Sequence, residues 1–393
     1  MRIALVHDWL TGMRGGEKVI SALCRLLPEA DLLTLVHVRG ACDRWIERMR
    51  IITSFLNDLP GVKRYYRYLL PAMPLAIERL NAGDYDLIVS SSHCVAKGIV
   101  RSPNAAHVCY CYTPMRYAWD QAQAYQRNMG LAGLALRALR GYLRAWDLRS
   151  AAHVDFFLAD SRNVARRIWR TYRRTAEVVY PPIDTGFFTP SDEAREPFYL
   201  MVTALAPYKR VDQAIAAFAK LSRPLRIIGS GQEMKKLRRT CPANVTLMGW
   251  QCDEVVREHY RRCRALVFPG EEDFGMVPLE AMACGAPVIA YGAGGALETV
   301  LDVRQQTAVG PTGLLYRQQT VDALVSAVTR FEQFEDRFER RRLVAWAKCF
   351  SEENFFERFK RAVRPLLRVK GVSEPWSDAT TAQSSRWQAQ VTS

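Results

Sequence analysis

The sequence predicts an α/β protein with two Rossmann-like domains, each built on a parallel sheet. The first observation is that short apolar runs alternate with longer amphipathic ones. Repeated strand–helix units of this kind build parallel sheets through right-handed crossovers. The second is a length of 393 residues, which suits two domains better than one. The third is a stretch at 178–198 with four prolines, which separates two sets of these units.

The first set of units precedes the proline-rich stretch. Its apolar runs predict strands and the amphipathic runs after them predict helices: strands at 2–10, 86–93, 107–112 and 154–161, helices at 15–27 and 162–172. Alternation along 107–112 places Cys109 and Cys111 on one face of a strand, where buried free thiols are expected. We assign residues 1–180 to this domain.

The second set of units follows the proline-rich stretch and is assigned to residues 181–350. It has the same alternation: strands at 198–205, 224–231, 264–270 and 285–292, helices at 210–221, 232–240 and 277–284. A further helix is expected at 351–369, with Ser351 in its N-cap region. Residues 370–393 are rich in Ser, Thr and Gln and have no periodicity, so a disordered tail is expected there.

Composition excludes several classes of protein. Apolar residues make up 49% of the chain, but no run has the roughly 18 apolar residues of a membrane span. The first residues read as a strand and not as a secretory signal, so a cytoplasmic protein is expected. The ten cysteines and six histidines show no zinc spacing. A net charge of +15 favours anionic partners, yet no nucleic-acid-binding signature accompanies it.

The stretch "EEDFGMVPLEAMACGAPVIA" carries the most specific chemistry. It places Glu272 in a loop after a strand and Glu280 in the first turns of the next helix. Backbone N–H groups from Gly275 to Val277 would form an anion site at the helix start. Each carboxylate can accept hydrogen bonds from a sugar diol, so the stretch suits a nucleotide-sugar. The alternative is that Glu280 only complements the helix dipole and Glu272 is solvated.

The full string "GEEDFGMVPLEAMACGAPVIA" resembles the donor-site signature of the retaining glycosyltransferases of family 4, with its Glu-x7-Glu motif. The resemblance runs from residue 1 to about 369. "SSSHCVAKGI", "HVCYCYTPMRYAWD", "YPPIDTGFF" and "TALAPYKRVDQAIAAF" resemble bacterial mannosyltransferases of O-antigen and exopolysaccharide synthesis. The resemblance implies a GT-B fold, in which two domains face a cleft and the C-terminal helix crosses back to the N-terminal domain.

The resemblance also implies roles for individual residues. Catalytic roles fall to Glu272, Lys209 and His93. Contacts to the donor fall to a larger set: Glu280, Arg210, Phe274, Gly275, Met276, Val277, Gly15 and Gly16. His93 could equally be a structural histidine. Two departures stand out, because relatives usually have Arg where this chain has Ala204 and His where it has Tyr112. Arg210 is expected to replace the missing arginine in part.

The reaction implied is transfer of a hexose, with GDP-mannose or a UDP-sugar as donor, to a glycan or lipid-linked glycan acceptor. We expect no cofactor and no metal, because the Asp84-x-Asp86 pair reads as a turn before its strand. Three alternatives stay open: a sugar-phosphate-accepting synthase, an epimerase of the same fold, and a degenerate transferase that only binds.

Contact with a membrane is expected from two basic, apolar segments. Arg137, Arg140 and Arg144 recur at helical spacing beside leucines, and residues 63–71 cluster cations with tyrosines. These segments favour an anionic membrane surface at the inner face of the plasma membrane. The alternative is that the leucines pack on the domain and the arginines are solvated.

Overall fold

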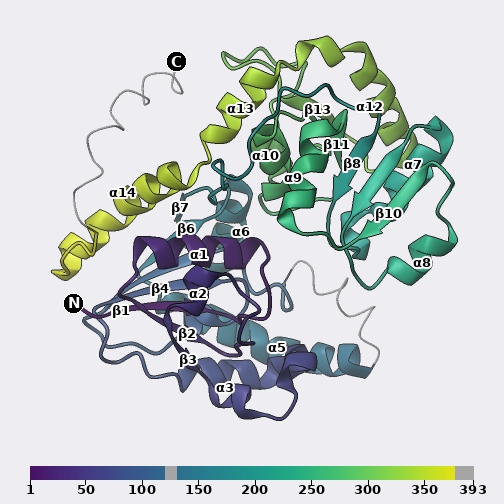
Figure 1. Cartoon of the computed structure of the whole chain (residues 1–393). Helices are drawn as coiled ribbons and strands as arrows, with labels where there is room; N and C mark the ends of the chain where they lie inside the picture. The colour runs from purple at the N-terminus through teal and green to yellow at the C-terminus, as the bar shows by residue number, and fades with distance from the viewer. Residues whose placement is uncertain (120–130, 377–393) are drawn as a thin grey trace. The chain divides into compact units, whose positions relative to one another are not determined.

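Two parallel sheets organise the chain (Figure 1). The computed structural model describes residues 1–119 and 131–376; for 131–138 it gives the backbone alone. Contacts divide the chain into two units, Met1–Leu158 with the chain from Phe359, and Ala159–Arg358. The predicted α/β fold with two parallel-sheet domains is confirmed. The division falls at Ala159, whereas the sequence placed it near residue 180.

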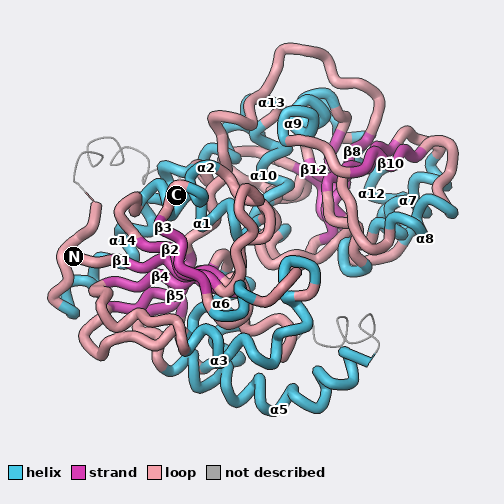
Figure 2. The backbone as a smooth tube through the Cα atoms, turned by 60° about the horizontal axis from the view of Figure 1, so that its bottom comes forward, coloured by secondary structure: helices cyan, strands magenta, loops and turns pink. Residues whose placement is uncertain are grey.

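The first sheet has seven strands in the order β3-β2-β1-β4-β5-β6-β7. The strands are β1 (Ile3–His7), β2 (Asp31–Thr34), β3 (Arg50–Thr53), β4 (Leu87–Ser92), β5 (Ala106–Cys111), β6 (Phe156–Ala159) and β7 (Ala176–Val178). The helices between its strands are α1 (Gly15–Leu26), α2 (Arg44–Glu47), α3 (Met73–Glu78), α5 (Leu131–Ala152) and α6 (Arg162–Tyr172). By its contacts α6, like β7, belongs to the second unit. Figure 2 shows the paired strands β1 to β5 running side by side.

The first unit buries apolar residues against its sheet. Ala4, Val6 and Ile88 pack in one core with Leu143 and Trp146 of α5. Figure 1 shows α1 over one face of this sheet and α3 with α5 over the other. Parallel register pairs His7 with Ser91, so the carboxyl ends of β1 and β4 meet at one edge. Ligands of open α/β sheets bind at this edge.

The second sheet has six strands in the order β10-β9-β8-β11-β12-β13. They are β8 (Tyr199–Val202), β9 (Leu225–Ile228), β10 (Val245–Gly249), β11 (Ala265–Phe268), β12 (Val288–Tyr291) and β13 (Gly313–Tyr316). The helices are α7 (Val211–Leu221), α8 (Met234–Arg239), α9 (Asp253–Arg262), α10 (Met276–Ala283), α11 (Ala296–Thr299), α12 (Val321–Gln333) and α13 (Arg340–Lys348).

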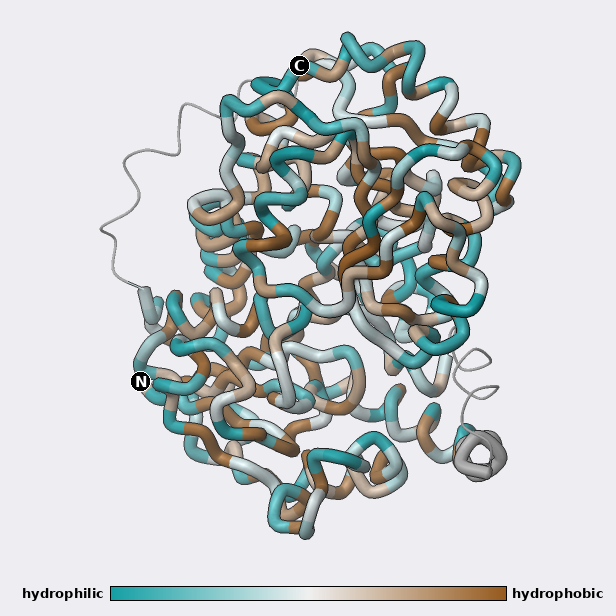
Figure 3. The backbone as a smooth tube through the Cα atoms, turned by 45° about the vertical axis from the view of Figure 1, so that its right-hand side comes forward, coloured by the Kyte–Doolittle hydropathy of each residue, from teal (hydrophilic) through white to brown (hydrophobic). Residues whose placement is uncertain are grey.

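Alternate strand residues of the second sheet enter two separate cores. Leu200 packs with Tyr260 and Leu279 of α9 and α10, whereas Tyr199 packs with Phe218 of α7. Two faces covered by helices explain why these strands are apolar throughout. Figure 3, coloured by hydropathy, shows hydrophobic segments within each unit.

The helix α14 (Glu352–Lys370) begins in the second unit, and its residues from Phe359 belong to the first. Its last residue, Lys370, has its ammonium 3.5 Å from the Asp155 carboxylate. The helix thus reaches the first unit, as expected for GT-B. The tail expected at 370–393 lies outside the described residues from 377 onward.

Candidate active site

The loop between β11 and α10 is shaped by glycines. Gly275 precedes α10 with a φ of +90°, a left-handed conformation that glycine adopts without strain. A Cβ on Gly270 would lie 3.1 Å from the Cα of Lys209, so two backbones meet closely here. The amides of Met276 and Val277 open the helix, where first-turn N–H groups have no intrahelical acceptor. The loop and helix start therefore offer an anion site at a strand's carboxyl end.

Lys209 and Glu272 form an ion pair across this site. Lys209 ends a 3₁₀ turn at Pro207–Lys209, and its side chain is 14% exposed. The side chain of Glu272 is 22% exposed. Such partial burial limits solvent screening of the pair. Arg210 follows, with its guanidinium 3.5 Å from Asp212 and 3.4 Å from the amide oxygen of Gln319. The structure thus brings Lys209 together with the first predicted acid, whereas Arg210 contacts Asp212 and Gln319.

Glu280 lies in α10 and is only 5% exposed. Its carboxylate accepts a hydrogen bond of 3.3 Å from the hydroxyl of Tyr260, which is fully buried. Burial and then the charge of Glu280 raise the pKa of that hydroxyl well above its ordinary value. Glu280 therefore has a structural partner inside the unit, which the sequence did not reveal.

Phe274 is buried and anchors the loop between β11 and α10. Its ring stacks on Tyr180, with centroids 5.4 Å apart and planes at 23°. Beneath it, the amide of Gly295 donates to the carbonyl of Glu272 at 2.8 Å. A Cβ on Gly295 would lie 2.1 Å from the carbonyl oxygen of Phe274, so only glycine fits there. Because the ring packs against Tyr180, a donor would contact the backbone of Phe274 and not its side chain.

Glu298 has a role that sequence reasoning missed. Its carboxylate accepts the backbone N–H groups of Arg162 and Asn163, at 2.8 and 3.0 Å, and the Tyr180 hydroxyl at 3.1 Å. The sequence places Glu298 in the first turn of the short helix α11, where a carboxylate could complement that helix's own dipole. It instead binds the first turn of α6, where a carboxylate complements the helix dipole. No local pattern signals a partner more than 130 residues away.

His93 is held by Asp8 at the carboxyl ends of β4 and β1. The buried Asp8 carboxylate lies 2.9 Å from Nδ1 of His93 and accepts four backbone N–H groups, those of His93, Cys94, Val95 and Ala96. Burial alone would raise the pKa of Asp8, but the charge and hydrogen bonds of His93 hold it well below its ordinary value. The His93 side chain stays 20% exposed. Asp8 thus fixes the ring of His93.

A chain of hydrogen bonds joins Gly16 to the same edge. The Tyr112 hydroxyl donates to the carbonyl of Gly16 at 3.1 Å and lies 2.8 Å from the Ser91 hydroxyl. Ser91 in turn lies 3.0 Å from Nδ1 of His7. Burial lowers the pKa of His7 to about 4, so this imidazole is neutral. Tyr112 therefore supports the glycine turn at Gly15 and Gly16, which begins α1.

Three other predicted features are placed as follows. Asp84 and Asp86 precede β4, and both contact Arg2. The carboxylate of Asp84 accepts a hydrogen bond of 3.2 Å from the guanidinium, and that of Asp86 accepts one of 2.8 Å from the backbone N–H. Cys109 and Cys111 are buried free thiols, as predicted. Ala204 is exposed just after β8, beside the turn that carries Lys209.

The arginine-rich helix α5 differs in part from its prediction. Leu143 and Trp146 are buried in the core. Arg140 and Arg144 donate to the carbonyl of Ala118 at 3.2 and 2.9 Å. The alternative in which the apolar face packs on the domain therefore holds for this part of the helix. The side chain of Arg137 lies outside the described residues.

Two family descriptions match the chain, one for each half. Residues 13–187 match "Glycosyltransferase Family 4" and residues 186–348 match "Glycosyl transferases group 1". Among curated proteins, an uncharacterized glycosyltransferase of Methanocaldococcus jannaschii is 29% identical over 217 residues, 54% of this chain and 59% of that protein. The GDP-mannose-dependent α-(1-6)-phosphatidylinositol monomannoside mannosyltransferase of Mycolicibacterium smegmatis is 30% identical over 177 residues, 38% of this chain and 44% of that protein. The chain spans about half the length of these curated relatives.

Solved structures confirm the fold. The Anabaena protein HepE in complex with UDP superposes with a TM-score of 0.67 at 16% identity, covering 93% of this chain and 100% of that one. Because the identity is low, this likeness concerns the fold.

Proposed function

We propose that this chain, whose two halves match the descriptions of the group 1 and family 4 glycosyltransferases, transfers a hexose from a nucleotide-diphospho-sugar. The observation that carries the proposal is the Lys209–Glu272 pair beside the start of α10. A cation and helix amides suit a leaving diphosphate, and an adjacent carboxylate suits sugar hydroxyls. In this proposal the turn that ends at Lys209 and the loop before α10 together bind both halves of a donor.

In the proposed reaction the diphosphate leaves toward Lys209, Arg210 and the amides of Gly275 to Val277. Preorganised charges of this kind stabilise developing negative charge without reorganising. The acceptor oxygen attacks the face that the diphosphate leaves, so configuration is retained, and the departing phosphate takes the acceptor's proton. Glu272 orients the sugar hydroxyls and Glu280 the ribose. No metal is required in this scheme.

We propose mannose as the sugar, with GDP-mannose as donor. The support is the relative whose name specifies GDP-mannose, at 30% identity over 38% of this chain. Because the structure of HepE contains UDP, a UDP-sugar is the second candidate donor. A glycan or lipid-linked glycan of cell-surface polysaccharide synthesis is the proposed acceptor, with His93 on the acceptor side.

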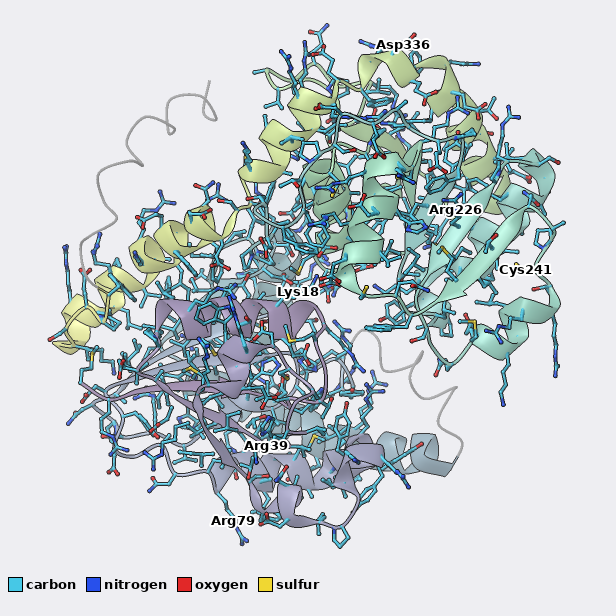
Figure 4. The ribbon with its side chains drawn as sticks, in the orientation of Figure 1. Lys18, Arg39, Arg79, Arg226, Cys241 and Asp336 are labelled. Carbon is cyan, nitrogen blue, oxygen red and sulfur yellow. The ribbon has the colours of Figure 1, made fainter. Side chains whose placement is uncertain are left out.

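We place the protein on the cytoplasmic face of an anionic membrane, through a surface within residues 55–79. Exposed apolar side chains and exposed cations alternate along it: Phe55, Leu59, Tyr68 and Leu75, and Lys63, Arg64, Arg67 and Arg79. Arg79 follows α3 and is labelled at its end in Figure 4. Cations with amphipathic aromatics suit a headgroup layer. No helix in the described part of the chain is long and apolar enough to cross a membrane.

A second candidate is a degenerate transferase that binds the donor without turnover. Ala204 provides no guanidinium where relatives have one, and Tyr112 is engaged with Gly16 and Ser91. Either change removes a group that could act in the reaction.

The test is donor turnover. Purified protein is incubated with GDP-mannose, UDP-glucose or UDP-galactose, a lipid extract and excess EDTA, and released nucleoside diphosphate and labelled lipid are measured. Transfer from one donor, with an anomeric configuration that matches the donor by NMR, supports the proposal. Nucleotide binding without transfer or hydrolysis supports the binding-only candidate instead.

A further inference from the structure

Three acids in succession, Glu271, Glu272 and Asp273, occupy the donor loop. Adjacent like charges repel, so the loop needs cations to hold it in one conformation. Two cations are supplied, and they come from different elements of the second unit. Lys209 pairs with Glu272, whereas Arg167 of α6 pairs with Asp273 and lies 4.0 Å from Glu271.

The acids alternate between these two cations. The first and third bind Arg167 and the middle one binds Lys209. Arg167 therefore holds both neighbours of Glu272 on one side and leaves Glu272 to point to the other, toward the candidate donor site.

Further contacts fix α6 against the loop. The Ser161 hydroxyl donates to the carbonyl of Asp273 at 2.8 Å and accepts the amide of Val164 at 3.1 Å, which caps α6. Glu298 accepts the two preceding amides of the same helix turn, those of Arg162 and Asn163. The side chains of Arg167 and Asp273 are 16% and 11% exposed, so water screens their pair weakly.

We propose that Arg167, acting through Asp273, is a positioning residue for the donor site: it sets the loop conformation in which Glu272 faces Lys209 and the sugar. Arg167 does not itself touch the donor in this scheme. The inference rests on the proposed function for its effect on the donor, but the ordering of the loop is independent of any ligand.

The test compares Arg167→Ala with the matched control Arg166→Ala, whose exposed side chain lies next to it on α6. Amide hydrogen exchange of residues 270–276 is measured without ligand. Binding of GDP and UDP, and the split between kcat and KM for the donor, are measured in parallel. We expect Arg167→Ala to speed exchange in the loop and to weaken donor binding about ten-fold, Arg167→Lys to fall between, and Arg166→Ala to match the wild type.

Asp273→Asn breaks the same ion pair from the side of the acid and keeps the backbone carbonyl that Ser161 binds, so it serves if Arg167→Ala does not fold. Unchanged exchange and unchanged donor affinity in both variants would overturn the inference. A wild type that binds no nucleotide would instead overturn the proposed function, while the exchange result still decides whether Arg167 orders the loop.

Discussion

Asp8 binds His93 through both backbone and side chain: its carboxylate accepts the amide of His93 at 2.8 Å and lies 2.9 Å from ring Nδ1. The same carboxylate also accepts three further amides. We expect Asp8→Asn to lower the free energy of unfolding by about 3–5 kcal/mol, because removing one partner of a buried charged pair leaves the other partner uncompensated. His93→Ala should cost far less. Urea denaturation measures both, and a loss below about 1 kcal/mol for Asp8→Asn would contradict this role.

The Lys209–Glu272 pair predicts opposite effects of one substitution on two ligands. Glu272→Gln removes the charge that neutralises Lys209, so a nucleoside diphosphate without sugar should bind several-fold more tightly. The sugar loses a charged hydrogen-bond acceptor, so donor turnover should fall about 10- to 100-fold. Calorimetry with the diphosphate and initial rates with the donor measure the two effects. Equal weakening of both ligands would show that Glu272 only holds the loop.

Burial of Glu280 makes its substitution by alanine ambiguous, because the Tyr260 hydroxyl would lose its acceptor. Glu280→Gln keeps an acceptor oxygen for Tyr260 and removes the charge. We expect it to weaken binding of the nucleoside diphosphate about ten-fold, by weakened hydrogen bonds to the ribose, with little change in thermal stability. Tyr260→Phe is the control and should leave binding unchanged. If Tyr260→Phe weakened binding as much as Glu280→Gln, the carboxylate would be structural.

Two buried histidines predict a loss of stability in mild acid. Burial lowers the pKa of His7 to about 4 and that of His107 to about 3. The unfolded chain takes up these protons near pH 6.5 and the folded chain does not, so stability is full above pH 6.5 and falls as pH drops. Each histidine should cost about 2 kcal/mol between pH 6.5 and 5. His107→Gln should remove about half of the slope in urea denaturation. An unchanged slope would mean that His107 is protonated in the fold.

The surface within residues 55–79 predicts binding to anionic vesicles. Lys63→Glu with Arg64→Glu should abolish flotation with phosphatidylglycerol vesicles at low salt, because each cation near such a surface contributes about 1 kcal/mol. The matched control is Lys235→Glu with Arg239→Glu on α8, which makes the same charge change at exposed positions of the second unit. If both variants lost flotation equally, net charge alone would explain the binding to vesicles. If the wild type did not float with the vesicles, this surface would be excluded as a membrane contact.

Strands with long apolar runs were predictable from the sequence, including β1, β4, β8 and β11. The strands β2, β3, β7, β10 and β13 were not assigned, because charged residues, threonine or glycine interrupt or shorten their apolar runs. The loop between Glu272 and Glu280 followed from its motif. Contacts such as Asp8 with His93, Tyr260 with Glu280 and Glu298 with α6 could not be predicted, because they join residues far apart in sequence.

The most direct test of the donor site is calorimetric titration of the wild type and of Lys209→Met with GDP, UDP and ADP in EDTA. The proposed function predicts that one of the three binds the wild type with a stoichiometry of about one, and that Lys209→Met weakens this binding about 100-fold or more through loss of the diphosphate's cation. Binding of none of them, or equal binding by Lys209→Met, would contradict the assignment of this loop as a donor site.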